Sequence, residues 1–428
     1  MKPPHHWIDQ SSRCMALLCF AIFSGSAFAA PYVPSSDLTP LEKLATRVTK
    51  RANDSAPGAS KTVAPGPSAS PSAPAGSSGP SSRAMRSLLA RDPKNLDLAL
   101  RIAQLYMSRA RTESDPRFLG QAQAALAPWW AQSDPPVPVL LLRATIRQSN
   151  HDFKNSRLDL EQAVRREPNN AQAWLTLATV QQVTGDIKAA ADSCNKLQPL
   201  TARLISTTCL AAVDGARGQA TQAFDAIKAV LALPEPARGA NVGVRTWALT
   251  LQAELAERLA RPADAEKLYV ASLALDADDA YTIATYADFL IDAGRAKEVL
   301  SLIPATTRVD TLLLRRAIAA KLAASPDAGQ VAAELGERFA ASKARGDRIH
   351  LREEARFVLA IKNSPEEAVS LARDNWDIQK EPLDARILLE AVLAARQPKA
   401  AREILTWVAT HQLQGEKLTQ LVAQVRAL

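Results

Sequence analysis

Aromatic residues, cysteines and histidines are scarce in this chain of 428 residues. Aromatics make up 5% of the sequence, which also contains four Cys and five His. The histidines form no HExxH motif and have no Cys, Asp or His at metal-ligand spacing, which argues against a zinc site. Neither a P-loop nor a GxGxxG motif is present. The sequence therefore predicts no metal, no cofactor and no catalytic residue, and we expect His151, His350 and His411 to be solvated residues at helix ends.

The chain also lacks a strong excess of one charge and a long apolar run. Lys and Arg number 52 against 44 Asp and Glu, and the resulting net charge of +8 is too small an excess to indicate nucleic-acid binding. The longest apolar stretch covers residues 15–23, well short of the about 20 residues that cross a bilayer. We therefore expect no nucleic-acid partner and no transmembrane segment in the mature chain.

The first 29 residues have the layout of a secretory signal. Lys2 and Arg13 precede the apolar run, and Ala27 and Ala29 place small residues where signal peptidase requires them. The prediction is a cleaved signal peptide at residues 1–29 and a periplasmic protein. A retained signal anchor is the alternative, and the short apolar run argues against it.

Residues 30–81 are expected to form a mostly disordered linker. Most of this segment, from residue 55 onward, consists of Ser, Ala, Pro and Gly with hardly a charge. Such a composition cannot bury enough apolar surface to offset the entropy that ordering would cost.

From residue 82 onward the sequence repeats itself. A shift of 34 residues superposes 140–168 on 174–202 and places His151-Asp152 over Gly185-Asp186. This resembles the tetratricopeptide repeat, in which two short helices are joined by a Gly-Asp type of turn. The positions that fit the pattern are Trp174, Leu177, Ala178, Gly185 and Ala190. Arg143 and Arg147 depart from it, since Leu and Tyr are common at those positions of the repeat.

The resemblance implies an all-α fold, a right-handed superhelical solenoid of antiparallel helix pairs. It covers residues 82–303 well, and residues 304–428 are expected to be divergent repeats of the same kind that end in a capping helix. Each pair cannot cover its apolar face alone, so neighbouring pairs must stack. No strand-like alternation appears in this part of the chain, which argues against an α/β enzyme.

The same resemblance implies a binding site. In tetratricopeptide arrays the first helix of each pair lines a concave groove that holds an extended peptide or a partner helix. Carried onto this sequence, the partner-binding positions are Gln172, Thr179, Gln182, Trp247, Glu254, Glu257, Tyr281 and Asp288. Trp247 is open to a second interpretation, in which its side chain packs between helices.

Two cysteines remain after the signal peptide is removed, Cys194 and Cys209. They fall in adjacent helices of neighbouring repeats, at similar heights on either side of one turn. In an oxidising periplasm they are expected either to form a disulfide or to remain as two buried small hydrophobic residues.

The leading functional hypothesis is a non-enzymatic periplasmic scaffold that binds protein or peptide partners through its groove, in the assembly of an envelope or secretion complex. The alternative is an exported helical cell-wall enzyme, active on peptidoglycan or polysaccharide, in which Glu254 or Glu257 is the acidic group.

Overall fold

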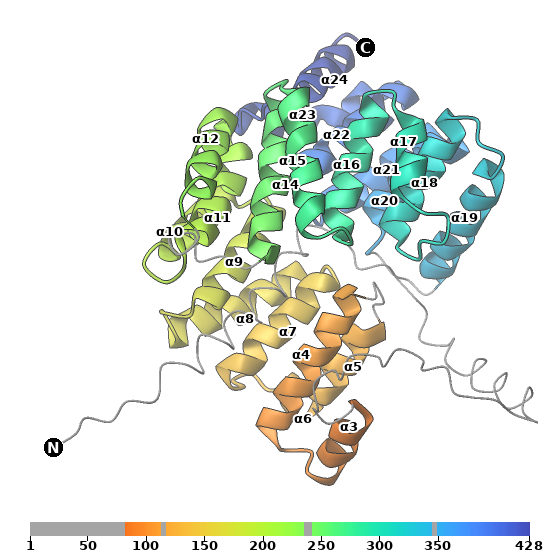
Figure 1. The fold of residues 1–428 in the computed structure, drawn as a ribbon. Helices are drawn as coiled ribbons and strands as arrows, with labels where there is room; N and C mark the ends of the chain where they lie inside the picture. The colour runs from red at the N-terminus through yellow and green to blue at the C-terminus, as the bar shows by residue number, and fades with distance from the viewer. Residues whose placement is uncertain (1–81, 113–116, 235–241, 345–348) are drawn as a thin grey trace, which may run out of the picture.

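The computed structural model describes residues 82–112, 117–234, 242–344 and 349–428, all of which are helix, turn or loop (Figure 1). The expected signal peptide and linker, residues 1–29 and 30–81, lie outside the described residues. None of the described helices combines the length and the hydropathy that crossing a membrane requires. The all-α prediction is confirmed for the part of the chain that the structure describes.

Consecutive helices pack side by side in pairs, and successive pairs stack on one another. The pairs of the first part are α4 (Leu96–Thr112) with α5 (Arg117–Ala125), α7 (Val137–Ser149) with α8 (Phe153–Arg166), α9 (Ala171–Val183) with α10 (Ile187–Lys196), α11 (Arg203–Gly215) with α12 (Ala220–Leu231), and α14 (Val242–Arg258) with α15 (Pro262–Leu275). Those of the second part are α16 (Ala280–Asp292) with α17 (Ala296–Leu302), α18 (Asp310–Leu322) with α19 (Ala328–Ala344), α20 (Leu351–Phe357) with α21 (Pro365–Trp376), and α22 (Pro382–Ala395) with α23 (Arg402–Thr410). The remaining elements are α3 (Ser82–Arg91), α6 (Ala127–Trp130), a π-helical turn η3 (Val358–Lys362), a 3₁₀ turn η4 (Pro398–Ala401) and α24 (Glu416–Arg426).

The turn inside each pair explains the repeat. His151 and Gly185, which are 34 residues apart, both have left-handed backbone angles, with φ of 58° and 83°. The aspartate that follows each of them caps the next helix, since Asp152 accepts from the Asn155 amide and Asp186 from the Ala189 amide. A left-handed residue costs least when it is glycine, so His151 carries a backbone cost that Gly185 does not, as do Ala260 and Ala324 in later turns.

Small residues let the two helices of a pair approach closely. Ala144, Ala178, Ala190 and Ala253 are at most 2% exposed. Ala144 lies in an apolar cluster of α7, α8 and α9, and the other three lie in a larger cluster that continues from α9 to α18, where a further cluster begins and extends to α24. No pair has a core of its own, as the stacking argument requires.

The departures from the repeat pattern at Arg143 and Arg147 have a common partner. Asp159, on the facing helix α8, accepts from Arg143 at 2.7 Å and from Arg147 at 2.6 Å. Arg143 also donates to the carbonyl oxygens of Trp130 and Gln132, and thereby fixes the segment that contains α6. A buried carboxylate and two guanidinium groups thus take the place of an apolar contact between α7 and α8.

The chain curls so that its C-terminal helices return to the central pairs (Figure 1). The Lys380 amide donates to the Val183 carbonyl oxygen at 2.7 Å. The Gln414 side chain accepts from the Ala220 amide at 2.9 Å, across 194 residues of sequence. Nothing in the repeat pattern predicts this return.

Cys194 and Cys209 form a disulfide in the structure, with 5.6 Å between their Cα atoms. The bond joins α10 to α11 and therefore ties two neighbouring pairs together. Both residues are at most 5% exposed, inside the large apolar cluster.

We predict that a chain beginning at residue 30, denatured without reductant, contains no free thiol. Reduction, or the double change Cys194→Ala and Cys209→Ala, should lower the free energy of unfolding by about 3 kcal/mol, the value expected for a loop of 15 residues. Thiol titration and urea unfolding measure the two effects. Two reactive thiols in the unreduced protein would contradict the bond.

Candidate binding groove

The first helices of four successive pairs, α9, α11, α14 and α16, share a face that we call the groove. A pocket of about 150 Å³ lies on it and is closed on its other side by residues from α20 and the start of α22. We call α20 and α22 the closing helices. The polar and aromatic residues that line the pocket are Thr179, Gln182, Trp247, Glu254, Arg258 and Tyr281 from the groove, with Arg352 and Glu381 from the closing side.

Five of the eight predicted groove residues line this pocket: Thr179, Gln182, Trp247, Glu254 and Tyr281. The other three lie elsewhere. Gln172 donates to the Thr176 hydroxyl of its own helix at 3.1 Å. Glu257 and Asp288 face other side chains of the protein, as described below. Trp247 packs against the apolar cluster and also lines the pocket. It is therefore both a groove residue and a residue packed between helices.

Two carboxyl groups of α14 accept hydrogen bonds from tyrosine hydroxyls. Glu254 accepts from the Tyr281 hydroxyl, and Glu257 accepts from the Tyr269 hydroxyl. Burial raises the pKa of Glu257 to about 8, against the effect of its tyrosine. The charges of Glu254, Asp292 and Asp288 add to this increase. Burial therefore favours the protonated form of Glu257.

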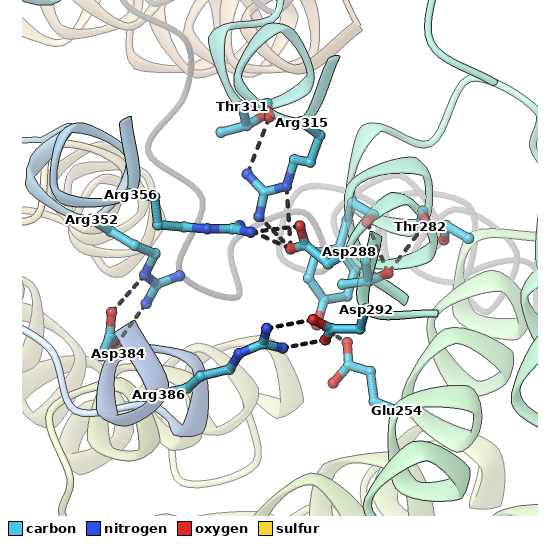
Figure 2. A network of polar contacts seen from close by, with 12 residues as sticks. Glu254, Thr282, Asp288, Asp292, Thr311, Arg315, Arg352, Arg356, Asp384 and Arg386 are labelled. Carbon is cyan, nitrogen blue, oxygen red and sulfur yellow. Dashed lines mark hydrogen bonds and ion pairs between the residues drawn. The ribbon is translucent and has the colours of Figure 1, made fainter. Parts of the chain in front are cut away.

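Asp288 of α16 lies between two guanidinium groups (Figure 2). Its carboxylate accepts from Arg315 of α18 and from Arg356 of α20, each at 2.8 Å. Burial opposes ionisation of Asp288, but the two positive charges outweigh it and hold the pKa of Asp288 well below its ordinary range. The Arg315 side chain is 1% exposed, so this is an ion pair removed from solvent.

A second carboxylate of α16 meets the other closing helix. Asp292 accepts from both terminal nitrogens of Arg386 of α22, one of them at 2.6 Å (Figure 2). Such two-pronged contacts fix the geometry of the partners as well as their charge. Asp288 thus binds an arginine of α20, and Asp292 binds an arginine of α22.

Arg352 holds the closing helices to each other. It donates to Asp384 and to Glu381, both at 2.6 Å. Asp384 also accepts from the Glu381 amide at 2.9 Å, which caps the start of α22. The closing side of the pocket is therefore joined by a buried arginine.

Two of the three histidines are not solvated, and that expectation was wrong. His350 is 3% exposed at the start of α20. His151 is half-buried in the turn after α7, where burial and the nearby charges of Arg352 and His350 lower its pKa to about 3. The return of α20 to the earlier repeats places these residues near one another. Within the described ranges, no group of three or more His, Cys, Asp and Glu side chains is arranged to hold a metal ion.

Comparison with known proteins gives no family model and no curated protein that matches this chain. Several solved structures are similar to it. A tetratricopeptide repeat protein from Parabacteroides merdae is 11% identical, with a TM-score of 0.36, over 69% of this chain and 98% of that one. Yeast Tom70 is 10% identical, with a TM-score of 0.38, over 81% and 84%. A chain of the Cut9–Hcn1 hetero-tetramer of the APC/C is 14% identical, with a TM-score of 0.39, over 80% and 58%. These similarities are loose, and the fold is defined by the helix pairs themselves.

We predict that the raised pKa of Glu257 makes stability depend on pH. The native state keeps a proton that the unfolded chain releases near pH 4.5, so this residue's contribution to stability falls as the pH rises from about 4.5 to about 8. Glu257→Gln has no such proton to release, and its stability relative to the wild type should increase over that interval. Urea unfolding at about pH 5 and about pH 8 measures the difference.

The matched control is Glu337→Gln, which changes an exposed glutamate of α19. Its difference from the wild type should be the same at both pH values. Parallel behaviour of Glu257→Gln and the wild type would show that Glu257 titrates as an ordinary carboxyl group.

Proposed function

We propose that this protein is a non-enzymatic periplasmic scaffold that binds a protein or peptide partner through the groove, in the assembly of an envelope or secretion complex. The observation that supports the proposal most is the pocket on the groove, where Trp247 and Tyr281 lie beside charged side chains. Aromatic and arginine side chains in a partly enclosed pocket are the typical composition of a protein-binding hot spot. Lys2, Arg13 and the small residues at 27–29 support export, and a disulfide suits an oxidising compartment.

The size of the pocket suits one side chain of a partner. A volume of about 150 Å³ accommodates a single anchor, while the rest of the partner would lie along the groove helices. Leu175, Leu251 and Leu383 supply its apolar walls. Gln182 adds an amide to the lining that can orient a polar group.

The cell-wall enzyme is not supported by these contacts. Glycoside hydrolysis requires two carboxyl groups on either side of one bond. Of the two candidate acids, Glu254 lines the pocket and Glu257 does not. Each accepts a hydrogen bond from a tyrosine of the protein itself, and a pocket for one side chain is small for a polysaccharide. We therefore propose no enzymatic activity.

The proposal predicts that Trp247→Ala lowers partner capture. With the full-length tagged protein crosslinked in cells and purified from the envelope, the recovered partner should decrease at least about fivefold, because hot-spot anchors carry most of the binding energy. The helical signal in circular dichroism should stay at the wild-type level.

The matched control is Val270→Ala on α15, an apolar residue that is 53% exposed and does not line the pocket. Its recovery of partner should equal that of the wild type. Equal recovery with Trp247→Ala would remove the groove from the proposed function.

A further inference from the structure

The groove already holds arginines that come from the protein itself. Asp288 and Asp292 stand one turn apart on α16 and receive Arg356 and Arg386. These contacts join residues 68 and 94 positions apart in sequence. The closing helices thus show which chemistry the acidic groove accepts: planar guanidinium groups presented from a helix.

The closing helices and the groove meet through a contact that can open. The two large apolar clusters meet at α18, and across the groove Ile291 of α16 packs against the second cluster while Leu383 of α22 lines the pocket. The charged contacts Arg356–Asp288 and Arg386–Asp292 also connect the two sides, together with the backbone hydrogen bond from Lys380 to Val183. Polar interfaces between parts of one chain allow relative motion unless a large apolar area holds them together.

We propose that the groove is a docking site for an arginine-bearing helix of the protein partner, and that the closing helices occupy this site in the free protein. The inference rests on the proposed function and names the chemistry of its partner. Two arginines one turn apart on the partner helix would replace Arg356 and Arg386 on Asp288 and Asp292. Arginine suits these sites better than lysine because its planar fork matches a carboxylate with two hydrogen bonds.

The partner must compete with the closing helices. Its apparent affinity equals its intrinsic affinity reduced by the fraction of molecules in which the groove is open. A change that weakens the closed contact should therefore strengthen partner binding, and a change that locks the contact should abolish binding.

Two variants of the full-length protein make this test. Arg386→Gln removes a closing arginine and leaves the groove residues intact. Gly185→Cys with Lys380→Cys locks the contact, because a Cβ atom at Gly185 would lie 3.3 Å from that of Lys380, close to the separation that a disulfide spans. The reduced double variant carries the same backbone strain at residue 185, where φ is 83°, and is the control for it. The probe is a fluorescent helical peptide of residues 350–362, stapled on its outer face, which carries Arg352 and Arg356 one turn apart.

Fluorescence anisotropy should show weak binding to the wild type and at least about fivefold tighter binding to Arg386→Gln. The oxidised double-cysteine variant should not bind until reductant is added. Wild-type protein with the same reductant is the control for reduction of the Cys194–Cys209 disulfide. A probe with both arginines changed to lysine should bind more weakly. Unchanged affinity in Arg386→Gln, or full binding by the oxidised variant, would overturn the inference.

The outcomes separate this inference from the proposed function. Peptide binding that follows the two variants, with no partner captured in cells, supports the docking chemistry and counts against the scaffold. A cellular partner captured equally by the wild type and the locked variant supports the scaffold and overturns the inference. Concentration-dependent dimers of Arg386→Gln would assign the groove to a second copy of this chain and also overturn it.

Discussion

A carboxylate removed from water must find positive charge, and Asp288 finds it in two arginines from different parts of the chain. Arg315 belongs to the adjacent helix pair, whereas Arg356 reaches the same carboxylate only when the closing helices lie against the groove. Asp292 likewise accepts hydrogen bonds from an arginine of the closing helices, Arg386. These contacts, together with the hydrogen bonds from Lys380 to Val183 and from Ala220 to Gln414, place the C-terminal pairs against the groove.

The stacking of helix pairs and the closure of the groove have different physical origins. Stacking buries alanine-rich faces and continues from pair to pair through the apolar clusters. Closure depends on charge, since the groove supplies Asp288 and Asp292 and the closing helices supply arginines. An array held in these two ways keeps its pairs stacked while one surface contact opens, and such an array suits a scaffold whose site is covered in the free state.

Local features of the fold could be predicted from the sequence because they depend on neighbouring residues. The shift that places His151 over Gly185 located the turn of each of those two pairs. The return of the closing helices could not be predicted, since it sums small rotations over many pairs. One signal was available for Asp159: the arginines at 143 and 147 replace apolar residues, and a buried arginine implies an acidic partner on the facing helix. For the groove, the repeat pattern selected the residues of one face and had no information on what covers them.

The most direct test of this account is a double-mutant cycle between Asp288 and Arg356, two residues that meet only through closure of the groove. Urea unfolding of Asp288→Asn, Arg356→Gln and the double variant gives their coupling free energy. A closed groove predicts a coupling of at least about 1.5 kcal/mol, as measured for close charge pairs elsewhere. Additive effects, with no coupling between the two changes, would contradict the contact on which the rest of the structure depends.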